Sequence, residues 1–254
     1  MCVIVVMKRS IILFLLFSVM LVGLHAQERR VQNRPYTDLR PFHFGVIVGT
    51  HAQDMEFRNV GPRLVETEEG GMMEKTIVTD QDRWDVGFTV GVLGEFRLSE
   101  FFQFRIAPAL YFGTRHITLR NLSDLTPDGK PIEQHQEMKS AYMTSAFDLI
   151  FAAPRFNNHR PYIMAGINPL VTLSSKSDDY LRVKPFDVCI EAGIGCDFYL
   201  PFFKLRPELK FMYGLTNSLD TKHAAQLKDK NMRMYTESVD KARTKMIVLS
   251  FYFE

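Results

Sequence analysis

Two histidines lie beside threonines in segments that otherwise resemble strands, as Thr50-His51 and as Thr114-Arg115-His116. A histidine next to a hydroxyl could serve as a general base toward a nucleophile. No Ser/His/Asp spacing in the chain is diagnostic, however, and catalytic triads are recognised by geometry rather than by sequence position. We therefore expect a non-enzymatic protein without catalytic, cofactor-binding or metal-binding residues. A lipid A or phospholipid-modifying enzyme that uses His51 and His116 is kept as an alternative.

A second set of reactive side chains lies in residues 186–215, FDVCIEAGIGCDFYLPFFKLRPELKFMYGL. Successive side chains of a strand point to opposite faces, and sorting this stretch by parity places every charge in the same row. A hairpin that turns at Pro201-Phe202 would set acids against bases on one face, as expected for cross-strand pairs. The row contains Asp187, Glu191, Asp197, Lys204, Arg206, Glu208 and Lys210.

The same alternation recurs along the chain, for instance in residues 84–97, WDVGFTVGVLGEFR, where apolar residues alternate with polar or small ones. Such a period of two indicates strands with one apolar face. It predicts eight strands, at about 42–57, 84–98, 101–116, 138–152, 161–174, 185–200, 203–215 and 243–253.

The connections between these strands alternate in length. Long polar segments cover 58–83, 117–137, 175–184 and 216–242, whereas the joins near 99–100, 153–160 and 201–202 are short. An even number of strands with short turns on one side and long loops on the other is typical of an outer-membrane barrel. The closing strand, Met246 to Glu254, alternates and has an aromatic-x-aromatic end, as such barrels do.

Three other architectures fit less well. A soluble lipocalin-like barrel would place the apolar row inside and needs a polar exterior that the glycine-rich row supplies poorly. A β-sandwich would have shorter strands with turn signals every 8–12 residues or so. Two small domains would need a linker rich in Pro, Gly and Ser. We therefore predict an all-β fold, an eight-stranded antiparallel transmembrane β-barrel.

With the apolar row toward lipid, the charged row must fill the lumen. An eight-stranded barrel is only wide enough for its own side chains to fill. Paired charges would then make a closed plug, because an unpaired buried charge is costly. The expected inward set is Asp85, Glu95, Asp148, Asp187, Glu191, Asp197 and Glu208 with Arg97, Arg105, Arg115, Lys204, Arg206 and Lys210. His43 is expected in the lumen at the periplasmic rim.

The N-terminus has the composition of a secretory signal peptide. Lys8 and Arg9 precede the apolar run from Ile11 to Leu24, and a small residue, Ala26, ends it. We divide the chain into a signal peptide at 1–26, a short periplasmic N-terminal arm at 27–41 and the barrel at 42–254. Translation could start at Met1 or Met7. The net charge of +2 gives no reason to expect a nucleic-acid partner.

Several blocks resemble the PorT family. They are Arg40-Pro41-Phe42-His43-Phe44-Gly45, residues 160–166 (RPYIMAG), residues 191–215 and the ending Met246 to Glu254. They follow one another in order along the mature chain, and DFYLPFFKLRPELKF is the most specific of them. PorT-like proteins are outer-membrane barrels of the type IX secretion system, linked in some bacteria to gliding motility.

The resemblance implies a non-enzymatic part in exporting cargo such as proteases and adhesins, with no catalytic residues to transfer and no cofactor. Expected partners are the lipid bilayer of a Gram-negative outer membrane, other type IX components and, during insertion, the barrel-assembly machinery. The termini would be periplasmic and the long loops extracellular. The alternative is a stand-alone, OmpX-like surface barrel for adhesion or partner binding.

Overall fold

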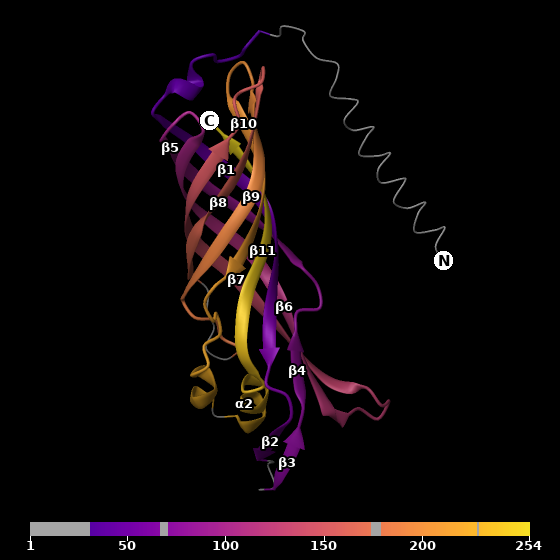
Figure 1. Ribbon diagram of the computed structural model, residues 1–254. Coiled ribbons are helices and arrows are strands. Elements are labelled where there is room, and N and C mark those ends of the chain that lie inside the picture. Colours follow the sequence, from indigo (N-terminus) through magenta and orange to yellow (C-terminus); the bar gives the residue numbers. More distant parts are fainter. Residues whose placement is uncertain (1–30, 67–70, 174–178, 228) are drawn as a thin grey trace, which may run out of the picture. The chain divides into compact units, whose positions relative to one another are not determined.

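Eight antiparallel strands pair edge to edge into a closed barrel (Figure 1). They follow the order β6-β5-β1-β11-β10-β9-β8-β7, and the pairing of β6 with β7 closes the ring. The all-β, eight-stranded prediction is confirmed, with strand bounds within a few residues except at β6, β7 and β11. The strands are β1 (Phe42–Asn59), β5 (Asp85–Arg97), β6 (Phe102–Leu125), β7 (Pro131–Ala152), β8 (His159–Thr172), β9 (Phe186–Tyr199), β10 (Lys204–Gly214) and β11 (Val239–Phe253).

The computed structural model describes residues 31–66, 71–173, 179–227 and 229–254. The predicted signal peptide, residues 1–26, lies outside them. Asn33–Glu254 forms the unit that contains the barrel. Among the residues the structure describes, no helix is long and apolar enough to cross a membrane.

The two ends of the barrel differ. At the short-turn end, residues 98–101, 153–158 and 200–203 connect neighbouring strands, and Glu254 follows the last one. At the long-loop end the predicted loops are partly ordered. This end carries β2 (Arg63–Glu66), β3 (Met72–Lys75), β4 (Ile77–Asp80), the short 3-10 helix η2 (His223–Gln226) and α2 (Lys230–Thr236). A further 3-10 helix, η1 (Thr37–Leu39), precedes β1.

The prediction that 117–137 forms a loop is wrong, because β6 and β7 continue as a paired ribbon to Leu125 and Pro131. Beyond the apolar belt the outward side chains become polar, so the contrast between the rows fades. Ile117 and Leu119 still point inward and are buried, whereas Arg120 lies on the other side. β4 pairs with residues 118–121 of β6, beyond the residues 103–112 that pair with β5.

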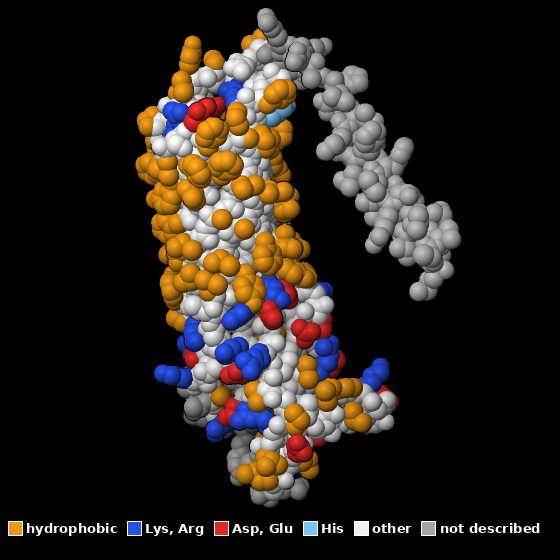
Figure 2. Space-filling view, viewed as in Figure 1, with side chains coloured by type: hydrophobic (Ala, Val, Ile, Leu, Met, Phe, Trp, Pro, Cys, Tyr) orange, Lys and Arg blue, Asp and Glu red, His pale blue; other side chains and the backbone are white. Residues whose placement is uncertain are grey.

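Burial alternates along the strands as the apolar and charged rows require. On β5, Val86 is 72% exposed and Phe88 56%, while Leu93 and Glu95 are fully buried. Figure 2 shows the result on the face in view, where hydrophobic side chains form a broad belt and charged side chains gather beyond it at the long-loop end. An apolar exterior over a charged interior contradicts the soluble lipocalin-like alternative.

Gly195 of β9 is needed because of its cross-strand neighbour, Tyr162 of β8. A Cβ added at Gly195 would overlap the Tyr162 ring and its hydroxyl. Tyr162 in turn donates a hydrogen bond of 2.7 Å to Glu208 Oε2 inside the barrel. The absence of a side chain at residue 195 therefore allows a tyrosine to lie flat against the wall and reach the lumen network.

We predict that Gly195→Val lowers the free energy of unfolding by about 1–3 kcal/mol, the usual cost of overpacking a filled interior. The measurement is urea unfolding of the refolded barrel in detergent, followed by the shift between folded and unfolded gel bands. Ile194→Val, on the outward face where Ile194 is 62% exposed, should change stability by less than about 0.5 kcal/mol. Equal stability of Gly195→Val and wild type would contradict the packing account.

Candidate functional site

The lumen contains nearly all of the charges predicted to point inward. Twelve of the thirteen predicted residues are buried, and only Arg97, at the end of β5, is partly exposed. Arg105, Arg115 and Arg206 are each 0% exposed, which is rare for arginine unless it is paired. The partners of these side chains determine what the lumen can do.

Arg206 of β10 is held by two carboxylates on different strands. Its Nε donates to Asp197 Oδ1 of β9 at 2.5 Å, the neighbour expected from the hairpin. Its two Nη atoms donate to both oxygens of Glu95 of β5, Nη2 at 3.1 Å from Oε1. β5 and β10 are separated by β1 and β11 in the ring, so this fork bridges the lumen. Bidentate pairing of this kind fixes geometry as well as charge.

Glu208 forms a second bridge, between walls that face each other. It accepts from Arg105 Nη1 of β6 at 2.8 Å, and β6 and β10 lie four strands apart in the eight-stranded ring. The hydroxyls of Tyr162 and Tyr252 also donate to Glu208, each at 2.7 Å. The Arg105 guanidinium lies 4.6 Å from the centre of the Tyr252 ring, a cation–π distance.

Further pairs extend the network toward both ends. Glu191 accepts from Lys210 Nζ at 3.0 Å and from Asn168 Nδ2 at 2.8 Å. At the short-turn end Glu254 forms ion pairs with Lys204 and, at 3.5 Å, with His43. His43 thus lies in the lumen at this end, as predicted.

Not every charge finds an opposite one. Asp187 accepts from the hydroxyl groups of Thr216 and Ser218 instead of from a base. Within the part of the chain that the structure describes, neither oxygen of Asp148 has a hydrogen-bond donor, and Arg115 is held only by Gln53 Oε1 at 3.2 Å and by the Tyr142 ring. The prediction of acid facing base across the hairpin is therefore confirmed for Asp197 and Glu191.

These side chains are packed closely in the middle of the barrel. Glu95, Arg105, Asp148 and Arg206 are each 0% exposed. Buried apolar residues such as Leu93 fill the space between the charges. The lumen is a packed interior, as expected for eight strands.

The structure separates the two histidines considered as catalytic. His51 lies inside the barrel, 1% exposed, where Nδ1 is 3.1 Å from Thr89 Oγ1 and the ring packs against Tyr111. His116 lies in the outward-facing row of β6, and its Nδ1 is 2.8 Å from Asp85 Oδ1. His51 therefore does not face lipid, which is where a lipid-modifying enzyme needs its base.

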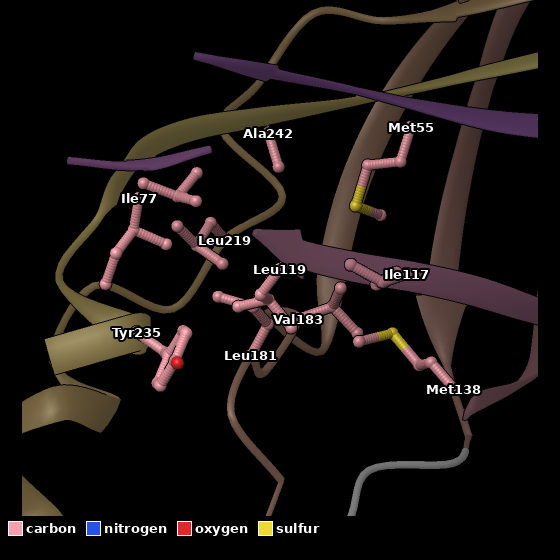
Figure 3. Packing of buried hydrophobic residues seen from close by; sticks show 11 residues of the cluster. Met55, Ile77, Ile117, Leu119, Met138, Leu181, Val183, Leu219, Tyr235 and Ala242 are labelled. Carbon is pink, nitrogen blue, oxygen red and sulfur yellow. The ribbon is translucent and has the colours of Figure 1, made fainter. Parts of the chain in front are cut away.

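A hydrophobic cluster closes the long-loop end. Figure 3 shows its side chains converging from strands, loops and helix α2. Leu181, Val183 and Leu219 come from loops, and Tyr235 comes from α2. The remaining members are Met55, Ile77, Ile117, Leu119, Met138, Val239 and Ala242. Beside it, Arg120 donates two hydrogen bonds to Asp82 and so holds the pKa of that carboxyl below its ordinary value.

Two grooves lie among these loops. A groove of 290 Å³ between β2, β3 and α2 is lined by apolar residues such as Leu64 and Met72, with Arg63 and Arg233 at its side. A second, of 490 Å³, lies near Arg58 and Asp240.

The chain before β1 is tied to the short-turn end. Asn33 N–H donates to Asn158 Oδ1 at 2.9 Å, and the Tyr199 hydroxyl donates to Asp38 Oδ1 at 2.5 Å. The Arg155 guanidinium stacks over Tyr199, 3.6 Å from the ring centre. The described part of the predicted periplasmic arm is thus folded against the barrel.

The part of the chain that the structure describes contains no assembled metal site and no disulfide. No group of three or more His, Cys, Asp and Glu residues is placed to hold a metal ion. Cys189 is buried in the lumen and Cys196 lies on the other row of β9, and both are free thiols.

A closed antiparallel barrel with an apolar belt and a filled polar lumen defines a transmembrane β-barrel. A family model described as the outer membrane protein beta-barrel domain matches residues 25–220, and the chain belongs to this family. It is an outer-membrane β-barrel protein. Among curated proteins, none matches the chain.

Two solved structures are similar to this chain. The outer membrane protein OprG from Pseudomonas aeruginosa has 11% identity and a TM-score of 0.42, over 83% of this chain and 91% of OprG. Neisserial surface protein A has 10% identity and a TM-score of 0.40, over 84% of this chain and 98% of that protein.

The lumen also contains uncharged polar residues that were not predicted from the sequence. Tyr162, Tyr252 and Asn168 complete the carboxylates' hydrogen bonds, and Gln53 is the only hydrogen-bond acceptor that the described residues offer Arg115. Their parity was the available signal, since each lies in the inward-facing row of its own strand.

We predict that Arg206→Glu destabilises the barrel by about 3–5 kcal/mol, the cost of removing one partner from a buried ion pair. The new carboxylate would stand beside Asp197 and Glu95, both buried. The temperature at which the folded gel band disappears reports the effect. The transition temperature of Arg206→Lys should lie between those of wild type and Arg206→Glu, because lysine keeps the positive charge but cannot form the bidentate pair.

Arg40→Glu is the matched control, since Arg40 is exposed before β1 and the same charge reversal there should leave the transition unchanged. An Arg206→Glu barrel as heat-resistant as wild type would show that the ion pairs do not stabilise the fold.

We predict that the purified barrel gives no stable ionic conductance in planar bilayers, because packed side chains fill the lumen. A porin reconstituted in parallel provides the positive control. A reproducible ohmic channel from the wild-type protein would contradict the closed lumen.

Proposed function

We propose that this barrel is a non-enzymatic outer-membrane component of the type IX protein secretion machinery, needed for export or assembly of cargo such as proteases and adhesins. The observation that carries the proposal is the ordered series of PorT-like blocks, above all DFYLPFFKLRPELKF. In this reading its partners are other components of that machinery, together with the barrel-assembly machinery during insertion.

The filled lumen supports a role as a component of a larger assembly. Cargo could not pass through a barrel whose central side chains are 0% exposed. The block that carries the resemblance also supplies Arg206 and Glu208, whose pairs with Glu95 and Arg105 bridge the walls. Contacts with other proteins would then be made at the ends or on the outer surface.

We further propose that the long-loop end is extracellular and the short-turn end, with both termini, periplasmic. Short periplasmic turns and longer extracellular loops are the rule for bacterial barrels. The absence of enzymatic activity is also a proposal. It is supported by the burial of His51 and by the pairing of His116 with Asp85, so neither of these two histidines faces lipid beside a hydroxyl group.

A stand-alone surface barrel is the second candidate. The observation that favours it is the folded layer at the long-loop end, where apolar residues such as Leu64 and Met72 line an open groove. Such a surface would suit adhesion or capture of a partner, without any part in secretion.

We expect deletion of the gene to leave cargo proteins inside the cell, with secretion restored by the wild-type gene. The measurement is the amount of cargo in culture medium and in periplasm, with adhesion and lipid composition followed in the same strains. Normal secretion with altered adhesion would favour the surface barrel, and an altered lipid A or phospholipid profile would favour an enzyme.

A further inference from the structure

The outward face of β1 and β11 carries six charged side chains just beyond the apolar belt. The last uncharged outward pair on these strands is Ala52 opposite Ile247. Beyond it, three successive outward pairs are Asp54 with Lys245, Glu56 with Arg243, and Arg58 with Lys241. This face thus has two acids and four bases at one edge of the membrane-spanning zone, where Figure 2 shows charged side chains gathering.

The first two pairs contain two acids and two bases, so their charges sum to zero. Lys245 Nζ lies 2.9 Å from Glu56 Oε2. Arg243 Nη1 donates to the Tyr213 hydroxyl at 3.0 Å, and that hydroxyl donates to Glu56 at 3.5 Å. An aromatic residue at this level is typical of the girdle of a membrane barrel.

The third pair has like charges. Arg58 stands directly opposite Lys241, an arrangement that destabilises a sheet when nothing lies between the charges. Both side chains are exposed. Among the residues that the structure describes, no carboxylate lies within 4 Å of either one, although Asp240 lines the neighbouring groove together with Arg58.

We propose that Arg58 and Lys241, with Arg243 beside them, bind a phosphate group of a membrane-lipid headgroup. A phosphate between the two cations would replace their repulsion with charge-assisted hydrogen bonds, and a guanidinium binds phosphate oxygens through two parallel N–H groups. The occupant is a phosphorylated glycolipid of the lipid A type, the choice that follows from the proposed orientation of the long-loop end. The site itself depends on the apolar belt and not on a role in secretion.

The position of the site fits a headgroup. Each step of two residues rises about 5 Å along the axis of a barrel whose strands tilt by about 40°. Arg58 and Lys241 are three such steps from the Ala52–Ile247 pair, hence roughly 15 Å, and Arg243 is two steps away. Side chains of this length can reach back by about 6 Å toward the membrane. Their charges then fall about 4–9 Å beyond the apolar edge, close to the depth of one headgroup layer, about 5–8 Å.

The test compares wild type with the Arg58→Gln, Lys241→Gln double variant in detergent micelles, by native mass spectrometry of the lipid-bound fraction. The added probes are diphosphorylated lipid A, the same lipid with its phosphates removed, and inorganic phosphate. We expect wild type to bind diphosphorylated lipid A about tenfold or more tightly than the variant does. The thermal transition of wild type alone should rise with this lipid, because a ligand of the folded state stabilises it.

The control is Arg40→Gln, Lys130→Gln, which removes one arginine and one lysine from exposed positions away from Arg58 and Lys241. It should bind like wild type. Without lipid, the Arg58→Gln, Lys241→Gln barrel should be at least as stable as wild type, since it lacks the repulsion; that result also shows that it folds.

Equal binding of diphosphorylated lipid A by wild type and the Arg58→Gln, Lys241→Gln variant would overturn the proposal. If wild type bound the phosphate-free lipid as tightly as diphosphorylated lipid A, the contact would involve only the rest of the lipid, and the proposal would also be overturned. Stabilisation of wild type by inorganic phosphate alone, to the same extent, would identify a free-phosphate site and exclude the lipid as its source. None of these outcomes depends on whether the barrel takes part in secretion.

Discussion

The bridges that Arg105 and Arg206 form across the lumen are the constraint on which the rest of the barrel depends. A guanidinium buried without a partner would cost several kcal/mol, so each must meet a carboxylate at hydrogen-bond distance. Because the partners Glu208 and Glu95 lie on distant strands, the walls have to stand at one separation. The ion pairs therefore fix the width and register of the ring, whereas the apolar exterior only requires contact with lipid.

That constraint explains which residues accompany the charges. A wide lumen would leave the carboxylates' remaining lone pairs to water, but here Tyr162 and Tyr252 donate to Glu208. A tyrosine needs room along the wall, and glycine provides it where Gly195 faces Tyr162. Aromatic rings then pack the space left between the charges and also contact the guanidinium groups from their faces. Glycines, tyrosines and charged residues therefore share the inward-facing rows for one reason, which is that the buried charges must be both paired and closely packed.

The sequence predicted the barrel well because parity is a strong signal wherever one face meets lipid. It placed Asp197, Arg206 and Glu208 in the lumen correctly, and the pairing of Arg206 with Asp197 follows from the hairpin. The bridge from Arg105 to Glu208 could not be predicted, because residues four strands apart share no local pattern. The ordered loops were missed for a related reason: Leu181, Leu219 and Tyr235 meet only through tertiary packing.

A lumen filled with buried side chains leaves the two ends and the outer surface of the barrel for contacts with other molecules. The long-loop end is built accordingly, since a cluster of eleven buried apolar residues holds strands, loops and α2 in fixed positions. Loops that served only as connections would not require such a core. Below this layer, β1 and β11 change from an apolar face to a charged one within a single pair of residues, from Ala52–Ile247 to Asp54–Lys245. The direct pairing of β1 with β11 sets the distance between Arg58 and Lys241, so the same strand register that aligns the lumen residues also places the cationic edge beneath the folded layer.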